Sequence, residues 1–402
     1  MNRWLSIVGL GEGGWAELPA LGRGLVEEAE LVVGGERHLA MLPATVKAKR
    51  TSWATPLRLT VEEILRHRGR PVAVLATGDP MYFGVGVTLA RAVANDEMLI
   101  LPSVSAFGLA AARLGWSLAD CECLTLHGRP LEKLAAFLYR GARLLLLSHD
   151  GSTPAKVAGE LARRGWGPSR LTALEHMGGP RENRIEGSAA EWGNRSVADL
   201  NTLAVECLPA ADTLSLPRLP GLPDEAFTHD GQITKREVRA VTLAALAPLP
   251  GQLLWDVGAG CGSISIEWVR CGRAMRATAI ESETKRCEII RANAATLGTP
   301  EIEIVNGTAP AALEGLAPPD AVFIGGGIAA PELVERCWAA LSAGGRLVAN
   351  VVTVQGEARL LHCREAFGGK LGRLAISRAE PVGGQLGWRA LMPVTQWTAV
   401  KP

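Results

Sequence analysis

Three glycines at alternate positions follow a short apolar run in the second half of the sequence, and this spacing suits a ligand-binding turn. Residues 253–257 have the composition of a buried strand, and Gly258, Gly260 and Gly262 come directly after them. Glycines let the backbone turn sharply and let a ligand approach more closely than any Cβ would allow. A helix predicted over residues 263–270 would direct its first N–H groups at the same place. The pattern predicts a nucleotide-type pocket at the carboxyl end of a strand.

The spacing of these glycines discriminates among nucleotide ligands. The dinucleotide fingerprint needs a glycine where Ser263 stands, and no Lys-Ser or Lys-Thr pair follows as in a P-loop. A second strand, predicted over residues 277–280, ends at Glu281, roughly 20 positions beyond the glycines, where an acceptor for ribose hydroxyls belongs. The alternative is a purely structural turn with a solvated Glu281. The order of strand, glycines, helix, strand and acid favours S-adenosylmethionine over NAD.

Polar residues also follow predicted strands in the first half. Asp79, Ser105 and the pair His127 and Arg129 each stand shortly after an apolar run that has the composition of a strand. Turn formers, helix caps and exposed charges would give the same pattern. The other interpretation is a pocket at the carboxyl ends of these strands, in which His127 and Arg129 meet an anionic substrate.

Composition limits the class of protein. The chain has 402 residues, too many for one hydrophobic core, so two domains are expected. A net charge of +1 argues against a general nucleic-acid binder, and no apolar run approaches the roughly 20 residues that span a bilayer. The first residues show no signal sequence, and the eight cysteines are scattered without the spacing of a metal site. These features predict a reduced, cytoplasmic protein that binds no metal.

The elements that must position these residues alternate between strand and helix. Apolar runs at residues 4–8, 72–76, 99–101, 144–147 and 171–174, with helical segments between them, make the first half α/β. Four prolines then fall within residues 209–223 and form a stiff connector. We therefore expect domains at residues 1–208 and 224–402, joined by this linker.

The second half has the pattern of a doubly wound sheet with an antiparallel finish. Thr234 and Glu237 form a capping box, which predicts a helix over residues 235–246 before the glycine turn. A further helix is predicted over residues 283–297 and another over 331–341. The remaining predicted strands lie at residues 301–305, 321–324, 345–353, 374–380 and 388–400.

These motifs, in this order, resemble one family over nearly the whole chain. The first half resembles the tetrapyrrole methylases in its opening turn, Gly9-Leu-Gly-Glu-Gly13, although Glu12 stands where that family usually has proline. Gly78-Asp-Pro80 and Leu126-His-Gly-Arg129 add to this resemblance. The second half resembles the partner decarboxylating methylase in Trp255-Asp-Val-Gly-Ala-Gly-Cys-Gly262. The chain is thus similar to the precorrin-6Y C(5,15)-methyltransferases (decarboxylating) of the cobalamin pathway, in their fused two-domain form.

The resemblance implies a fold and two cofactor sites. It implies an N-terminal tetrapyrrole-methylase fold of two α/β subdomains, followed by a Rossmann-like methyltransferase domain, each binding S-adenosylmethionine. The residues implied for the N-terminal site are Leu10, Asp79, Ser105 and Ala106. Those implied for the C-terminal site are Thr234, Gly258, Ala259, Gly260, Cys261, Gly262, Glu281, Thr308 and Ala309.

The resemblance also implies the reaction. The first half would methylate carbon 5 of precorrin-6B (precorrin-6Y), and the second would methylate carbon 15 and remove carbon dioxide from the acetate on carbon 12, giving precorrin-8X. A ring carbon is itself the nucleophile, so the protein mainly positions the reactants. Decarboxylation needs a proton donor, and the candidates are His229, Asp230 and Lys235.

The substrate of this family carries many carboxylates. Arg236 and Arg239 would bind them, together with His127 and Arg129, unless the two arginines are ordinary helix charges. Family habit implies a homo-oligomer.

Three other functions remain open at this point. A nucleic-acid methyltransferase with an accessory domain would favour an Asn/Asp-Pro-Pro-Tyr-like run, where this chain has Asp320-Ala-Val-Phe-Ile-Gly325. A dehydrogenase is disfavoured by the glycine spacing. The third is a tetrapyrrole-binding module with one inactive site.

Overall fold

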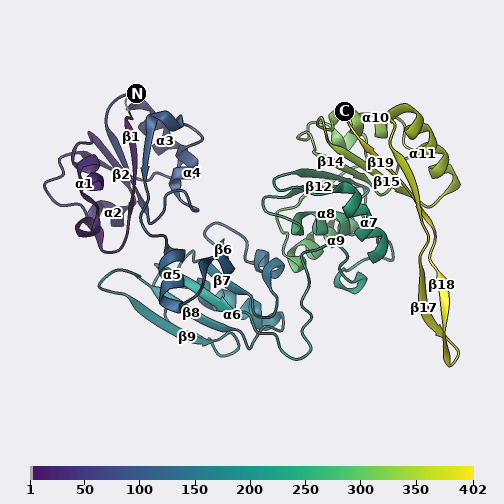
Figure 1. Cartoon of the computed structure of the whole chain (residues 1–402), viewed down its shortest axis with the longest axis horizontal. Coiled ribbons are helices and arrows are strands. Elements are labelled where there is room, and N and C mark those ends of the chain that lie inside the picture. The colour runs from purple at the N-terminus through teal and green to yellow at the C-terminus, as the bar shows by residue number, and fades with distance from the viewer. Residues whose placement is uncertain (1–2) are drawn as a thin grey trace. The chain divides into compact units, whose positions relative to one another are not determined.

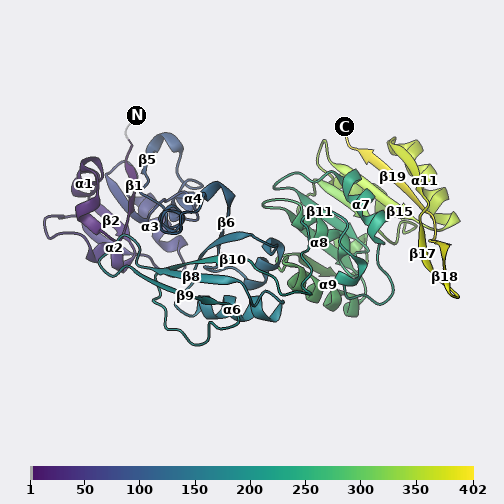
Figure 2. The same ribbon diagram turned by 60° about the horizontal axis from the view of Figure 1, so that its bottom comes forward.

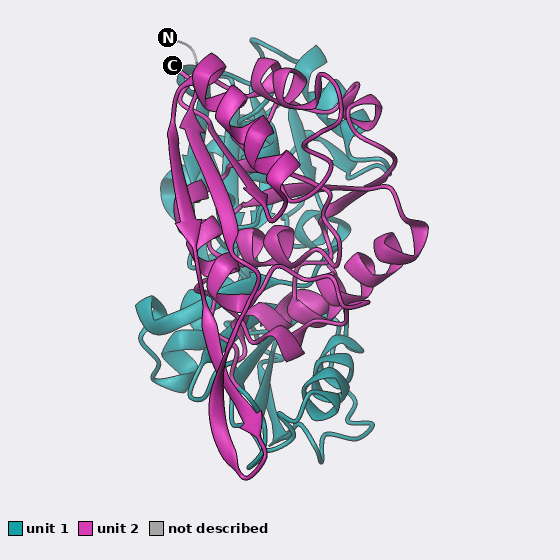
Figure 3. Ribbon diagram, turned by 90° about the vertical axis from the view of Figure 1, so that its right-hand side faces the viewer, with its two compact units in different colours: residues 1–129, 139–214 teal, residues 130–138, 215–402 magenta. Residues whose placement is uncertain are grey.

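The computed structural model describes residues 3–402, which divide into two compact units (Figure 3). The first unit comprises residues 1–129 and 139–214, and the second comprises residues 130–138 and 215–402. The point of division, between Leu214 and Ser215, falls within the proline-rich segment predicted as a linker. We propose that residues 209–223 act as that linker between two functional domains.

The first unit opens with a parallel sheet in the order β3-β2-β4-β1-β5 (Figure 1). The strands are β1 (Leu5–Leu10), β2 (Leu31–Gly34), β3 (Lys49–Ser52), β4 (Val72–Thr77) and β5 (Met98–Leu101). The helices beside them are α1 (Ala20–Glu27), α2 (Glu36–Ala40), α3 (Arg58–Arg66) and α4 (Val85–Leu89). One apolar core includes Ile64 of α3 and the other includes Val26 of α1, so helices cover both faces. This explains why β1 and β2 are buried along their whole length.

The second sheet of this unit is largely antiparallel, in the order β6-β7-β10-β8-β9 (Figure 2). Its strands are β6 (Cys121–Thr125), β7 (Arg143–Leu147), β8 (Arg170–Glu175), β9 (Asn183–Ser188) and β10 (Asn201–Glu206), with helices α5 (Ala106–Leu114) and α6 (Thr153–Arg163). The sequence predicts β7 and β8 but neither β9 nor β10. Strand β10 is inserted between two strands that precede it, a pairing set by tertiary packing and invisible to local periodicity.

The second unit has the predicted doubly wound sheet, in the order β13-β12-β11-β14-β15-β19-β16. Its strands are β11 (Leu253–Val257), β12 (Arg276–Glu281), β13 (Glu303–Asn306), β14 (Ala321–Ile324), β15 (Arg346–Val351), β16 (Lys370–Leu374) and β19 (Val394–Val400). The helices are α7 (Arg236–Leu246), α8 (Ser263–Arg270), α9 (Thr284–Leu297), α10 (Leu333–Ala340) and α11 (Val354–Phe367). Strand β19 pairs antiparallel with both β15 and β16, which confirms the predicted antiparallel finish.

Two local predictions in the second unit are wrong. The run predicted as one strand at residues 388–400 divides into β18 (Gln385–Ala390) and β19, and β18 pairs with β17 (Ser377–Val382) in a separate hairpin that extends from the sheet (Figure 1). The capping box is also absent. Lys235 occupies the N-cap position without a side-chain hydrogen bond, and Glu237 pairs with Arg378 at 2.6 Å.

Among the described residues no helix is long and apolar enough to cross a membrane. Within the same range, no group of three or more His, Cys, Asp or Glu side chains is placed to hold a metal ion.

Candidate functional site

The cavity of the second unit lies at the point where the strand order of its sheet reverses, between β11 and β14. This is the usual ligand position in such folds. Its volume is about 780 Å³, and the glycine turn after β11 and Gly325 to Gly327 after β14 line it. Gly258 has φ +73°, and a Cβ there would lie 2.9 Å from the backbone nitrogen of Gly326. Only glycine at position 258 therefore allows the two loops to meet.

Gly260 is the most open point of the turn. It has φ +60°, and a Cβ built there would meet only the Gln232 carbonyl, at 3.9 Å. Its N–H donates to Oε2 of Glu281 at 2.8 Å, while the N–H of Glu283 donates to Oε1 at 3.0 Å. Glu281 is buried and holds the turn, and each of its oxygens keeps acceptor capacity for a ligand hydroxyl.

Asp256 supplies a second carboxylate beside the turn. Its Oδ2 accepts hydrogen bonds from the Ser265 N–H at 3.0 Å and from the Ser265 hydroxyl at 2.6 Å. Its Oδ1 is buried and has no hydrogen-bond partner among residues 3–402. Burial raises the pKa of Asp256 to about 6. Asp256 therefore lies behind the turn and outside the cavity wall, and Glu281 is the carboxylate that the turn itself contacts.

The other predicted cofactor residues divide between the cavity wall and its surroundings. Thr234, Ala259 and Cys261 line the cavity. Thr308 and Ala309 do not; they lie just beyond Gly307, whose N–H donates to the Glu281 carbonyl at 3.0 Å. They remain candidates for the ribose and base end of the ligand.

Of the three predicted catalytic residues, only Lys235 lines this cavity. Asp230 is exposed and pairs with Arg286 at 2.8 Å, and this hydrogen bond lowers the pKa of the Asp230 carboxyl. A carboxyl group that stays ionised is no proton donor, so the structure argues against this role for Asp230. His229 accepts a hydrogen bond from the Gly231 N–H at 3.0 Å and lies outside the cavity wall.

The position of Arg239 argues against the predicted role in binding substrate. Its side chain is completely buried, with Nε 2.5 Å from Glu267 and Nη1 3.1 Å from Asp224. It also donates to the backbone carbonyls of Thr234 and Leu222, so it fastens α7 to the segment before it. Arg236, on the same helix, is exposed and lies outside the cavity wall.

Three loops of the first unit meet at the carboxyl edge of its parallel sheet. A Cβ on Gly9 would lie 2.0 Å from the Gly78 carbonyl oxygen and 2.6 Å from the Ser103 nitrogen, so only glycine lets the end of β1 touch the loops after β4 and β5. Leu10 is buried in the core, and its carbonyl accepts a hydrogen bond from the Gly78 N–H at 3.2 Å. Only its backbone is therefore available to a ligand.

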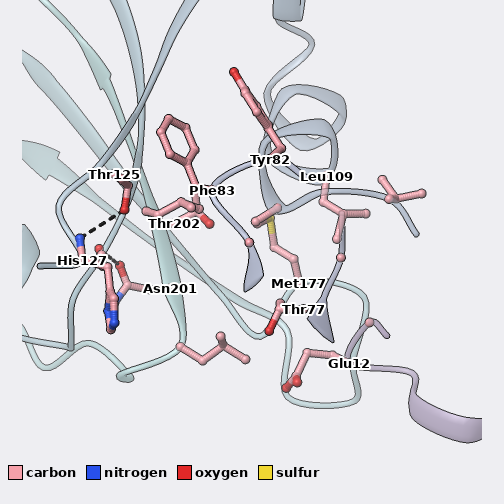
Figure 4. Close-up of a pocket in the computed structure, with 18 of the residues that line it drawn as sticks. Glu12, Thr77, Tyr82, Phe83, Leu109, Thr125, His127, Met177, Asn201 and Thr202 are labelled. Atoms are coloured by element: carbon pink, nitrogen blue, oxygen red, sulfur yellow. Dashed lines mark hydrogen bonds between the residues drawn. The ribbon is translucent and has the colours of Figure 1, made fainter. Parts of the chain in front are cut away.

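Next to these loops the first unit encloses a cavity of about 690 Å³ (Figure 4). Ala106, His127 and Arg129 line it, and an adjoining cavity of about 420 Å³ is lined by Asp79 and Ser105. The Asp79 carboxylate accepts the Met81 N–H at 2.8 Å, and the Ser105 hydroxyl caps α5 through the Gly108 N–H at 3.0 Å. Both side chains thus shape the loops around the cavities.

Sequence reasoning missed two groups of residues in this cavity. Tyr82 and Phe83 line one side of it, with ring centroids 5.1 Å apart (Figure 4). The signal available in the sequence was a pair of adjacent aromatic residues inside a loop of turn-forming residues. The second group is Glu12, Arg37 and His176, which come from three segments far apart in the sequence and also line the cavity.

Glu12 joins this second group together. Nδ1 of His176 lies 2.9 Å from Oε2 of Glu12, and Arg37 donates to the other oxygen of the same carboxylate. Burial lowers the pKa of His176, and the positive charge of Arg181 lowers it further, so the imidazole is neutral at pH 7.

Comparison with known proteins follows the same division of the chain. Residues 5–192 match the family described as Tetrapyrrole (Corrin/Porphyrin) Methylases, and residues 225–401 match the Precorrin methyltransferase domain. A Sinorhizobium protein named precorrin-6Y C(5,15)-methyltransferase [decarboxylating] is 48% identical over 401 residues, which is 100% of this chain and 97% of that protein.

Two shorter proteins are also similar. A Saccharolobus solfataricus protein named probable cobalt-precorrin-6B C(15)-methyltransferase (decarboxylating) is 33% identical over 37% of this chain and 78% of its own length. The crystal structure of the C-terminal domain of a Rhodobacter capsulatus precorrin-6Y C5,15-methyltransferase is 48% identical and covers 46% of this chain and 100% of that one, with a TM-score of 0.44.

Proposed function

The chain belongs to the precorrin-6Y C(5,15)-methyltransferase (decarboxylating) family, and on that premise we propose a division of its activity between the two units. The enzyme methylates its precorrin at carbons 5 and 15, with S-adenosylmethionine as donor, and removes a carboxyl group. We propose that the first unit methylates carbon 5. The second methylates carbon 15 and takes the carboxyl group from the acetate on carbon 12, giving precorrin-8X. The nucleic-acid alternative has no support from the similar proteins.

One observation carries this division: each unit has its own large cavity beside a glycine turn at the carboxyl edge of a parallel sheet. A precorrin is larger than one methyl donor, so each cavity has to admit the donor and one edge of the macrocycle. The similar 33% identical protein, named for carbon 15 and decarboxylation alone, supports the separation of the two activities.

Positioning is the main task of both cavities. S-adenosylmethionine supplies a sulfonium methyl group that an electron-rich ring carbon attacks directly. The loops hold the reacting atoms in line and exclude water, which supplies roughly 7–11 kcal/mol in well-oriented model reactions. In the second unit the backbone of Gly258 and Gly260 would hold the donor, with Glu281 on its ribose. In the first unit the loops at Asp79 and Ala106 would hold it.

The overall reaction is tested by mass spectrometry of the macrocycle after incubation with the purified enzyme, precorrin-6B and isotope-labelled donor. Two added methyl groups and one lost carboxyl group are expected. Fragmentation should place the label on both bridging carbons. A product that carries only one methyl group at saturating donor would contradict the proposal.

Lys235 is the proton donor or carboxylate partner that we propose for decarboxylation. It is the only basic side chain in the wall of the second cavity among the described residues, and no acidic side chain lines that wall.

Lys235→Met should slow release of labelled carbon dioxide by roughly 10²-fold or more, because general-acid groups contribute that much. Carbon 5 methylation should not change. Lys285→Met, on α9 and outside the cavity wall, is the matched control. Equal carbon dioxide release by both variants would exclude this role for Lys235.

The assembly and location of the enzyme are further proposals. We propose a homo-oligomer formed through the β17–β18 hairpin, where Leu386 is 73% and Trp388 is 80% exposed. Large exposed apolar side chains on a projecting arm are typical of interaction surfaces. Light scattering should give the mass of an oligomer for the wild type and a smaller mass for Trp388→Ser; equal masses would remove the hairpin from the interface.

The proposed location is the cytoplasm, supported by eight free cysteines.

A further inference from the structure

We propose that His176, oriented by Glu12, is the general base that removes the hydrogen from carbon 5 after the methyl group has been transferred. This proposal rests on the proposed function, because it assumes that carbon 5 reacts in the cavity of the first unit. Neither residue was among the sites predicted from sequence. Both line that cavity, as does Ala106 of the proposed donor site.

The chemistry requires a base at this step. A ring electron pair of a bridging carbon that carries one hydrogen forms the new C–CH3 bond, while the S–CH3 bond of the donor breaks and its electron pair stays on sulfur in the thioether that leaves. The carbon becomes four-coordinate, and the macrocycle gains a positive charge. Conjugation is restored when the C–H bond breaks, its electron pair returns to the ring and the proton leaves. His176 accepts that proton on Nε2 and later releases it to water, so the net change is one methyl group gained and one proton lost.

The hydrogen bonds of His176 fix which nitrogen is free. Nδ1 lies 2.9 Å from Oε2 of Glu12 and 3.4 Å from a nitrogen of Arg181. Arg181 can only donate, whereas a carboxylate can only accept, and the shorter contact is the stronger one. Nδ1 therefore carries the hydrogen and donates it to Glu12. Nε2 makes no hydrogen bond among residues 3–402 and keeps the lone pair that a general base needs.

The backbone at His176 supports a functional role. His176 follows β8 directly and has φ +45°, in the left-handed region that a non-glycine residue rarely adopts. Such strain is concentrated at functional sites, where surrounding contacts maintain it. Here the side chain of His176 contacts Glu12 after β1, and Glu12 in turn pairs with Arg37 at the start of α2.

The charges around the imidazole match the proposed role. Glu12, Arg37 and Arg181 face His176 from neighbouring elements, and Glu175 precedes it in the strand. Arg37 compensates the charge of Glu12, so that the carboxylate can orient the ring without leaving an isolated buried anion. Because the pKa of His176 is lowered from 6.5, the base is available at pH 7. It is lost by protonation as the pH falls through that lowered pKa.

The test uses His176→Gly, since glycine adopts the left-handed backbone without strain and leaves room for added imidazole. Single-turnover formation of the deprotonated, conjugated carbon 5 product should slow by roughly 10²–10⁴-fold, while the dissociation constants for donor and precorrin change little. Added imidazole should restore part of the rate, in proportion to its neutral form. A substrate deuterated at carbon 5 should show a primary isotope effect in the variant. Glu12→Gln should slow the step less, and His67→Gln, outside the cavities, should leave it unchanged.

The outcomes separate this proposal from the proposed function. If the wild type fails to methylate carbon 5 at all, the proposed function fails first. If the wild type reacts and His176→Gly reacts equally fast, His176 is not the base. A slow variant that imidazole does not restore, and that has lost affinity for the precorrin, would assign His176 to substrate binding and overturn the proposal.

Discussion

The Gly260→Arg variant is expected to lose methylation at carbon 15 and decarboxylation while it continues to methylate carbon 5. The space above Gly260 is open, with one atom at 3.9 Å from a built Cβ, so an arginine side chain would extend into the cavity where the donor is proposed to bind. The same change in a closed turn would unfold the domain. Here the backbone strain costs only about 1–2 kcal/mol, the price of a left-handed conformation for a residue with a Cβ.

Gly315→Arg is the matched control for this variant. Gly315 has φ +77° and no neighbour within 4 Å of a built Cβ, and it lies outside the cavity wall. Both variants carry the same strain and the same added charge, and only one of them blocks the cavity. Calorimetry should show one donor site per chain lost in Gly260→Arg and none lost in Gly315→Arg.

Product analysis completes the test. Mass spectrometry should find one added methyl group and no lost carboxyl group with Gly260→Arg, a loss of at least about 100-fold in the second reaction if the donor is excluded. A Gly260→Arg enzyme that still methylates carbon 15 would remove the glycine turn from the donor site. An enzyme that loses both methylations would show that the two units do not act independently.

Local sequence determined the central strands and helices of the second unit. Strand β11, helix α8 and strand β14 have the predicted bounds, because each is a buried apolar run or an amphipathic segment bounded by glycines. Gly258 and Gly260 were found for the same reason: a turn that needs positive φ and close approach accepts little else. The rest of the cavity wall follows from the fold, since β11 and β14 flank the point where the strand order reverses.

Long-range contacts decided the rest, and no local pattern reports them. Arg239 looks like an exposed helix charge until Glu267 of α8 and Asp224 are placed beside it. The Glu12, Arg37 and His176 group depends on three segments separated by up to 164 positions in sequence. Strand β10 pairs between β7 and β8 although it follows both in the chain. In each case the role of a residue or strand depends on a partner that is distant in the sequence, so the local pattern does not predict it.

Arg239→Met is expected to destabilise the second unit by roughly 3–5 kcal/mol, the usual effect of breaking a buried ion pair from one side. The side chain is 0% exposed, and its removal leaves Glu267, itself 1% exposed, as a buried anion. Two backbone N–H groups, of Gly221 at 2.6 Å and Leu222 at 2.9 Å, also reach Glu267, but neither carries a compensating charge. Asp224 is less affected, because Arg378 remains 3.0 Å away.

Thermal unfolding measures this effect. A loss of that size corresponds to a fall in Tm of roughly 6–20 °C for a domain of this length. Arg236→Met, on the exposed side of the same helix, should stay within about 0.5 kcal/mol of the wild type. Adding Glu267→Gln to Arg239→Met should recover part of the stability, since the unpaired charge is then gone.

Kinetics at low temperature separates a structural arginine from one that binds substrate. At a temperature where Arg239→Met remains folded, its KM for the precorrin should equal that of the wild type, because the guanidinium never reaches the cavity. A stable variant with a raised KM would mean that Arg239 turns outward to hold a substrate carboxylate. The buried network with Glu267 and Asp224 would then have to open during binding, which would leave Glu267 as an uncompensated buried carboxylate. That cost is why we expect the arginine to stay inside.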